Sequence, residues 1–169
     1  MTLKNVLPCL LLLVPAIALA QWITKAEEDI FTGGKKAIMV ATIGDYNSTT
    51  GIVFDCTKNG LSLAYVEKSS DPLKKANADI PFDMIVKIDA GEIRKTNAVA
   101  EQRNDQSIQI ISTERDLIIQ VLKEASKAKS KMIVGISNDA IGQHSVTATV
   151  NGSSKAISKF TSACEIDIK

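Results

Sequence analysis

The sequence contains 169 residues, of which 20 are lysine or arginine and 19 are aspartate or glutamate, so its formal net charge is +1. A chain so close to neutrality lacks the basic field with which proteins neutralise nucleic-acid phosphates, so we exclude a nucleic-acid partner. The length is sufficient for one domain with a substantial core.

Residues 1–20 have the pattern of a secretory signal. Lys4 precedes an apolar run that closes with Ala-Leu-Ala, and an apolar run after a positive start is typical of a cleavable signal peptide. The run is shorter than the roughly 20 residues of a membrane-spanning helix, and Pro8 and Pro15 interrupt it. We therefore expect one exported domain, residues 21–169, in the periplasm or outside the cell, with no integral membrane segment.

Seven later segments have the β-rich composition or the two-residue alternation that is typical of strands. They are predicted at residues 35–44, 51–56, 61–66, 83–89, 107–112, 131–137 and 145–150. Asn59-Gly60, between the second and third segments, favours a tight hairpin turn because both residues accept a positive φ. Two polar stretches separate other segments: residues 67–81 are predicted as a long loop, and residues 94–106 contain at most a short strand at 98–100.

Two segments have helical spacing. The first is residues 114–129, where apolar side chains recur on one face. These side chains are Leu117, Ile118, Val121, Leu122, Ala125 and Ala128. Thr113, with Asp116 three residues later, is expected to cap the start of this helix. A second helix is expected to begin near residues 152–154, with Ile157, Phe160 and Cys164 on one face.

Two cysteines remain once Cys9 leaves with the signal. In an oxidising compartment, Cys56 and Cys164 most simply form a disulfide. Cys56 shares a strand face with Ile52 and Phe54, so the bond is expected to join the last helix to a central strand. The alternative of two reactive thiols lacks the spacing of a CxxC centre, and a zinc site needs more ligands. We expect no metal and no cofactor.

The candidates for catalysis are few. A serine hydrolase would need His144 as base, with Ser145 as nucleophile and Asp139 as the orienting group. Neighbouring residues of a strand point to opposite faces, so His144 and Ser145 are badly placed for each other. The carboxylates considered for acid–base chemistry are Asp83, Asp89 and Glu92. Their flanks are typical of turns and strand edges, which favours solvated charges.

Three further features have a structural and a functional interpretation. Trp22 is either a ligand platform or an anchor of the chain terminus, and we favour the anchor. Asn47 and Asn151 match the glycosylation acceptor rule, but the second would crowd a helix start. The cluster Gly152-Ser153-Ser154-Lys155 resembles an anion cradle at a helix start, but it lacks the spacing of a nucleotide P-loop. A serine N-cap at Ser153 or Ser154 explains it better.

The order of several motifs along the chain is informative. After Trp22 come DIFTGGKKA, the strand GIVFDC, the segment VKIDAGEI and the closing stretch TATVNGSSKAISKFTSAC. This order resembles that of exported small β domains of the VasI type, which are associated with type VI secretion, and of the invasion-associated locus B-like proteins. Lys87 stands where that group often has arginine. The resemblance implies a bacterial envelope protein of mainly β (α+β) class. Its fold would be an antiparallel, β-sandwich-like domain of about seven strands and two helices, closed by one disulfide.

The resemblance supplies no catalytic residues, so we predict a non-enzymatic envelope protein that binds another protein. Its role would be that of a secretion-system or host-interaction accessory. The candidate partner-binding residues of the 67–81 loop are Lys68, Asp71, Lys74 and Lys75. An exposed sheet edge is a second candidate surface. The alternative is an inhibitor or immunity protein that blocks an envelope hydrolase, and the third hypothesis is a hydrolase.

Overall fold

A computed structural model of the chain describes residues 22–43, 50–69 and 80–168. The described residues form nine strands and two helices. The first strands are β1 (Trp22–Asp29), β2 (Gly34–Thr42), β3 (Thr50–Thr57), β4 (Gly60–Lys68) and β5 (Pro81–Ile88). They are followed by β6 (Arg94–Asn104), β7 (Ser107–Ser112), α1 (Arg115–Ala125), β8 (Lys131–Asn138), β9 (Gly142–Thr149) and α2 (Ser153–Ala163).

All nine strands belong to one sheet with the order β1-β2-β3-β4-β7-β6-β5-β8-β9. Every neighbouring pair is antiparallel. The mainly β class and the two helices are therefore confirmed, but the count of seven strands is wrong. A β-sandwich is not shown, because all nine strands belong to one bent sheet on which both helices pack.

The two additional strands are β1 and β6. In β6 the side chains that face the core are small, namely Thr96, Ala98 and Ala100, so the strand reads as polar. In β1 only Trp22 and Thr24 are buried, and three of the four exposed positions carry charges. A hydrophobic pattern detects a strand by its large buried residues, and both strands have few of them.

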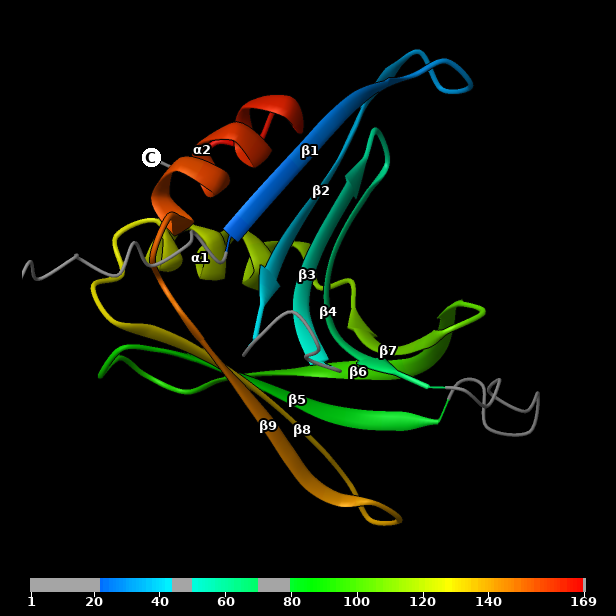
Figure 1. Cartoon of the computed structure of the whole chain (residues 1–169), viewed down its shortest axis with the longest axis vertical. Coiled ribbons are helices and arrows are strands. Elements are labelled where there is room, and N and C mark those ends of the chain that lie inside the picture. Colours follow the sequence, from blue (N-terminus) through cyan, green and yellow to red (C-terminus); the bar gives the residue numbers. More distant parts are fainter. Residues whose placement is uncertain (1–21, 44–49, 70–79, 169) are drawn as a thin grey trace, which may run out of the picture.

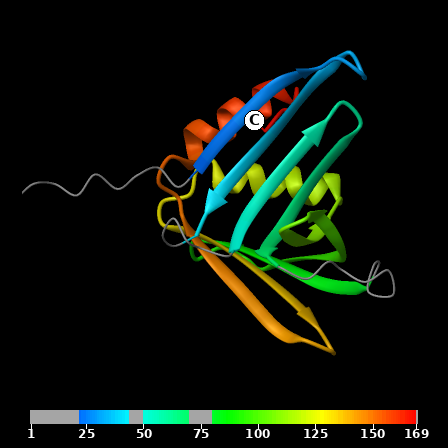
Figure 2. The same ribbon diagram turned by 45° about the vertical axis from the view of Figure 1, so that its right-hand side comes forward.

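The sheet is bent so that its two edge strands meet at one end and diverge at the other (Figure 1, Figure 2). At the closed end, the indole Nε1 of Trp22 in β1 donates a 2.6 Å hydrogen bond to the carbonyl oxygen of Thr149 in β9. Trp22 is buried, as expected for an anchor of the terminus. At the open end lie the β1–β2 turn, residues 30–33, and the β8–β9 turn, residues 139–141.

One face of the sheet and both helices enclose the core. The largest side chains with almost no exposed surface are Phe54, Phe160, Met39, Ile52, Leu63, Met84, Ile118, Leu122, Met132, Ile157, Val86 and Val121. At the closed end the ring of Phe54 lies 6.4 Å from that of Trp22 and 6.2 Å from that of Phe160, between ring centroids. Neither helix in the described part of the chain is long and apolar enough to cross a membrane.

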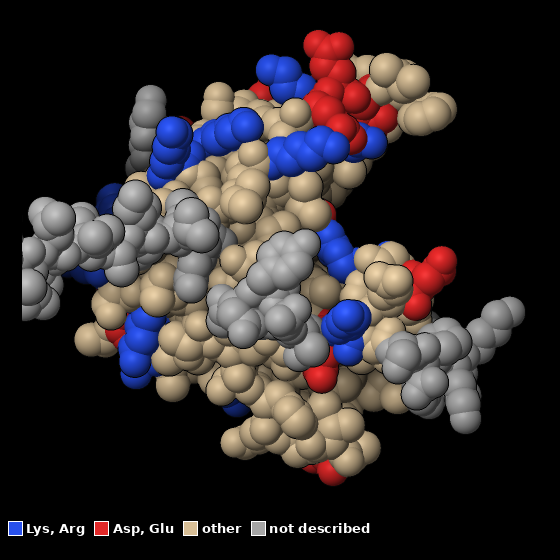
Figure 3. All heavy atoms as spheres, in the orientation of Figure 1, with Lys and Arg blue, Asp and Glu red and all other residues tan. Residues whose placement is uncertain are grey.

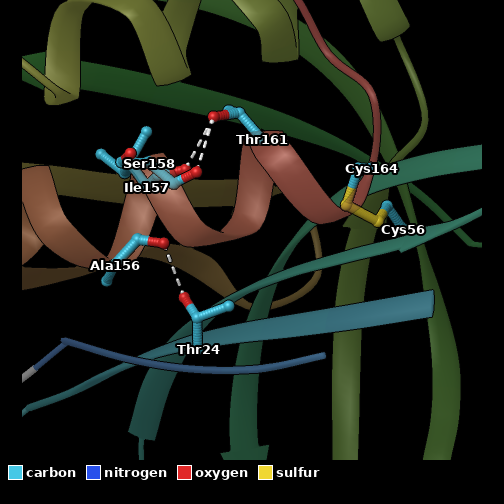
Figure 4. Close-up of a disulfide and its surroundings, with 7 residues drawn as sticks. All are labelled: Thr24, Cys56, Ala156, Ile157, Ser158, Thr161 and Cys164. Carbon is cyan, nitrogen blue, oxygen red and sulfur yellow. Dashed lines mark hydrogen bonds between the residues drawn. A yellow bond between two sulfur atoms is a disulfide. The ribbon is translucent and has the colours of Figure 1, made fainter. Parts of the chain in front are cut away.

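Covalent and polar bonds fasten α2 to the sheet (Figure 4). The predicted disulfide between Cys56 of β3 and Cys164 at the end of α2 is confirmed; it joins residues 108 apart, with a Cα–Cα distance of 6.2 Å. The hydroxyl of Thr24 in β1 donates to the carbonyl oxygen of Ala156 in α2 at 2.8 Å. The ammonium of Lys159 donates to the carbonyl oxygen of Thr24 at 2.9 Å. The last helix is thus held against both β1 and β3.

The predicted helix caps are wrong. The residue that precedes α1 is Glu114, and the one that precedes α2 is Gly152 with φ 82°; neither makes a side-chain capping bond. The hydroxyls of Ser153 and Ser154 instead donate to the carbonyl oxygens of Ala125 and Ser126, at 3.4 and 2.8 Å. These carbonyls lie at the C-terminal end of α1, which lacks intrahelical donors. The two serines therefore join one helix to the other.

Candidate functional site

The strongest candidate site is a hollow of about 370 Å³ at the open end of the sheet, which we name the open-end groove. Its floor consists of apolar side chains from β5, β6, β7 and β8 and from the residue before β5. These are Ile80, Phe82, Ala100, Ile108, Ile110 and Ile136. Its rim consists of Glu67, Lys68, Ser69, Ile141 and His144.

The groove is apolar because the core face of the sheet extends beyond the helices. Phe82 alternates with Met84 and Val86 on the buried face of β5, and Ile136 continues the buried face of β8. No residue of α1 or α2 is among those that line the groove. At its rim Ile141 is 47% exposed. Within the described part of the chain, the end of the core face is thus not covered by a helix.

Both chain ends that flank residues 70–79 are fixed at this groove. The backbone N–H of Ser69 donates to the carbonyl oxygen of Gln106 at 2.9 Å. The backbone N–H of Ala100 donates to the carbonyl oxygen of Ile80 at 3.4 Å. The side-chain amide of Asn138 donates to the carbonyl oxygen of Pro81 at 2.7 Å. These bonds connect β4 and β5 to the turns that surround the groove, so its walls are built on the sheet.

Of the four predicted partner-binding residues, Lys68 lies on the rim of the groove. Asp71, Lys74 and Lys75 lie outside the described residues. Lys68 is the only one of them that the structure places, and it stands at the end of β4 beside an apolar floor.

Two polar contacts involve rim residues. The Tyr65 hydroxyl lies 3.5 Å from a carboxylate oxygen of Glu67. Burial, with the neighbouring charge of Glu67, raises the pKa of Tyr65. The ring nitrogen Nε2 of His144 lies 3.2 Å from the carbonyl oxygen of Ile141 in the β8–β9 turn. A few polar groups around an apolar floor are typical of a binding pocket.

The hydrolase hypothesis has no geometric support in this region. His144 lies on the groove side of β9, and Ser145, as its strand neighbour, points to the other face. Among the residues that the structure describes, no hydrogen bond joins His144 to Ser145 or to Asp139. The described residues also contain no group of three or more His, Cys, Asp or Glu residues suited to a metal ion.

The carboxylates considered for acid–base chemistry differ in their surroundings. Asp89 accepts backbone N–H groups from Lys129, Ser130 and Lys131 at 2.8, 2.9 and 2.9 Å. These donors hold the pKa of Asp89 below its ordinary value, because they stabilise the carboxylate. Asp89 is therefore a partly solvent-exposed carboxylate that also anchors the connection into β8. Asp83 is exposed.

A polar network on the other face of the sheet was not predicted. Arg103 of β6 donates to both carboxylate oxygens of Asp55 in β3, at 3.0 and 3.1 Å, and to Gln109 at 2.6 Å. Val53 and Ala64 also face this side, and they are 4% and 0% exposed. Arg103 is engaged by protein groups, so this network stabilises the bent sheet.

Of the groove residues, only Ile108, Ile110 and Ile136 lie within the seven strands predicted from the sequence. Periodicity also does not show which strand ends the helices leave uncovered. Comparison of the chain with protein-family models, curated proteins and solved structures finds no match. Function therefore has to be inferred from the chemistry of the groove and of the sheet edges.

Proposed function

We propose that this protein is an exported, non-enzymatic binding domain that takes an apolar segment of a partner protein into the open-end groove. The observation that supports this most is the groove itself, about 370 Å³ with a floor of core-type side chains. Protein interfaces combine an apolar centre with a polar rim, and the groove has this arrangement.

Export is supported by the signal-like residues 1–20. The Cys56–Cys164 disulfide is consistent with it, because disulfides persist in oxidising compartments. The sequence resemblance favours an accessory role in secretion or in contact with a host. A partner segment with one or two large apolar side chains fits the groove, and Lys68 and His144 at the rim can pair with its polar groups.

The test uses photo-cross-linking from two exposed isoleucines. A photoreactive amino acid is placed at Ile141, on the groove rim and 47% exposed, or at Ile93, away from the groove and 58% exposed. In the native envelope we expect a discrete protein adduct from position 141 and none from position 93. The absence of an adduct at 141, or equal adducts at both positions, contradicts the proposal.

The cross-linked partner then allows a quantitative test. Ile141→Asp places a charge at the apolar rim, and we expect it to weaken binding of the purified partner at least about tenfold, which corresponds to roughly 1.4 kcal/mol. Ile93→Asp is the matched control and should leave the affinity unchanged. Isothermal titration calorimetry measures both. Equal affinities for the two variants would place the partner elsewhere on the surface.

A further inference from the structure

Strand β9 is an edge strand without the usual protection. Its sequence, Gly-Gln-His-Ser-Val-Thr-Ala-Thr, contains no charged residue and no proline. It pairs with β8 over all eight of its residues without a register shift. Natural edge strands are commonly blunted by charged side chains, proline, bulges or a covering element. Among the described residues, no strand pairs with the outer edge of β9.

The outward-facing backbone groups of β9 follow from three contacts. The carbonyl of Thr149 points away from β8, because it accepts the indole N–H of Trp22. The N–H and C=O of Lys131, which is opposite Thr149, both bond to Asp89 on the other side of β8. The N–H of Val150 points back and donates to Ser130. Odd-numbered residues of β9 therefore face outward, since the direction alternates along an antiparallel strand.

The free groups form a short run. Gln143, Ser145 and Thr147 direct their N–H and C=O groups outward, and within the described part of the chain no hydrogen bond to them is found. On one side the run ends at the β8–β9 turn. On the other side it ends at Thr149, whose carbonyl is occupied by Trp22. The centre of the run is Ser145.

We propose that β9 pairs antiparallel with β9 of a second copy of this chain, about a two-fold axis at Ser145. Gln143 then faces Thr147 of the second copy, and Ser145 faces Ser145. This register uses all the free outward groups and stops before the bond between Trp22 and Thr149. The two nine-stranded sheets become one continuous sheet.

The chemistry of β9 suits a second copy because a two-fold interface must be complementary to itself. An uncharged strand opposes no like charges when it meets itself. On the outer face the facing pairs are Ser with Ser and Gln with Thr, which can hydrogen-bond across strands. On the inner face His144 meets Val146. The pairing leaves the groove floor untouched and shares only the rim residue His144 with the proposed partner site.

The test measures the mass of residues 21–169, with the disulfide intact, by light scattering after size exclusion. We expect the mass of two chains. Ser145→Lys and Ser145→Glu should each give the mass of one chain, because the axis places residue 145 against itself. An equimolar mixture of the two variants should restore the mass of two chains. Ile23→Lys in β1, at a 62% exposed side chain, is the matched control and should leave the mass unchanged.

Cysteine substitution tests the register. Ser145→Cys should form a disulfide between copies under mild oxidation, whereas Thr147→Cys should not, because its Cα would lie beyond the roughly 7 Å limit of a disulfide from its own counterpart. The proposal is overturned by a one-chain mass of the unmodified protein at all concentrations. It is also overturned by a two-chain mass that survives both charged variants. If β9 instead receives a segment of another protein, the charged mixture does not dimerise, which likewise overturns it.

Discussion

The two edges of this single sheet are protected in opposite ways. Along β1 lies helix α2, and Lys159 of that helix donates to the backbone carbonyl of Thr24. Strand β1 also carries Lys25, Glu27 and Glu28. Strand β9 has no charged side chain, and no helix of the described residues covers its outer edge. Figure 3 shows this contrast on one face of the molecule, with charged side chains over the β1–β2 region at the top and a mostly uncharged β8–β9 hairpin at the bottom.

The contrast between β1 and β9 shows that each edge strand is protected by its own neighbouring residues. Unprotected edges invite strand addition, and β1 is covered, charged and fixed by a disulfide-linked helix. Strand β9 is protected only at Thr149, where the Trp22 indole ends the free run. An edge strand whose unpaired backbone groups form a short, defined run is suited to pair with another strand.

The largest predicted loss of stability comes from releasing the end of helix α2, which lies along β1. Cys164→Ser removes the bond that holds the end of α2 to β3, and native disulfides in small exported domains are worth about 2–5 kcal/mol. We expect a loss in that range in the free energy of unfolding, measured by urea denaturation. Amide exchange should accelerate along β1, because α2 covers that edge. Exchange along the outward groups of β9 should not change.

Reduction of the unmodified protein is the control for this variant. It breaks the same bond without changing the side-chain volume at position 164, so it should give a similar loss. An unfolding midpoint that is the same for Cys164→Ser and the unmodified protein would mean that the disulfide contributes nothing to holding α2 on the sheet.

Sequence periodicity identified the strands whose buried side chains are large, such as β3 and β8. It missed β1 and underestimated β6, because Thr96, Ala98 and Ala100 fill the core face of β6 with little apolar volume. Periodicity also shows that one face of a strand is buried without showing what covers it. The structure therefore does not show the expected sandwich, although the disulfide was predicted correctly, since both cysteines lie on apolar faces.

The site was less predictable than the fold. Lys68 was named from its place in a long polar stretch, but the apolar floor beside it depends on where α1 and α2 end over the sheet. The serines at the start of α2 show the same limit. A local cap is the nearest partner in sequence, yet Ser153 and Ser154 bond to α1, which lies 28 residues earlier. Such tertiary partners are not encoded in a local pattern.

A smaller change in stability is expected when one threonine hydroxyl is removed from either edge strand. Thr24→Val in β1 removes the buried 2.8 Å bond to Ala156 in α2, and we expect a loss of about 1 kcal/mol. Thr147→Val in β9 is the matched control: its side chain is exposed, so the change should stay within about 0.5 kcal/mol. Both are measured by urea denaturation at low protein concentration. Equal losses would show that α2 does not use Thr24 to hold the β1 edge.

The smallest predicted effect is a pH dependence that distinguishes the hairpin turns next to the two edge strands. Asp29 of the β1–β2 hairpin accepts the N–H of Phe31 at 3.1 Å and the hydroxyl of Thr32 at 2.6 Å. In the β8–β9 hairpin, Asn138 accepts the N–H of Ala140 at 2.8 Å in the same way. The Thr32 hydroxyl first, and the Phe31 N–H second, lower the pKa of Asp29. Only the first turn therefore contains a titrating acceptor.

A lowered carboxyl pKa stabilises the turn above the unfolded value, about 3.9, and this stabilisation is lost as the pH falls through the folded value. In an NMR titration from about pH 6 to about pH 2, the amide of Phe31 should shift as Asp29 is protonated. Asp29→Asn should keep the turn and abolish the shift. A Phe31 amide that still titrates in this variant would assign the pH dependence to another group near β1, and the two hairpins would then not differ through Asp29.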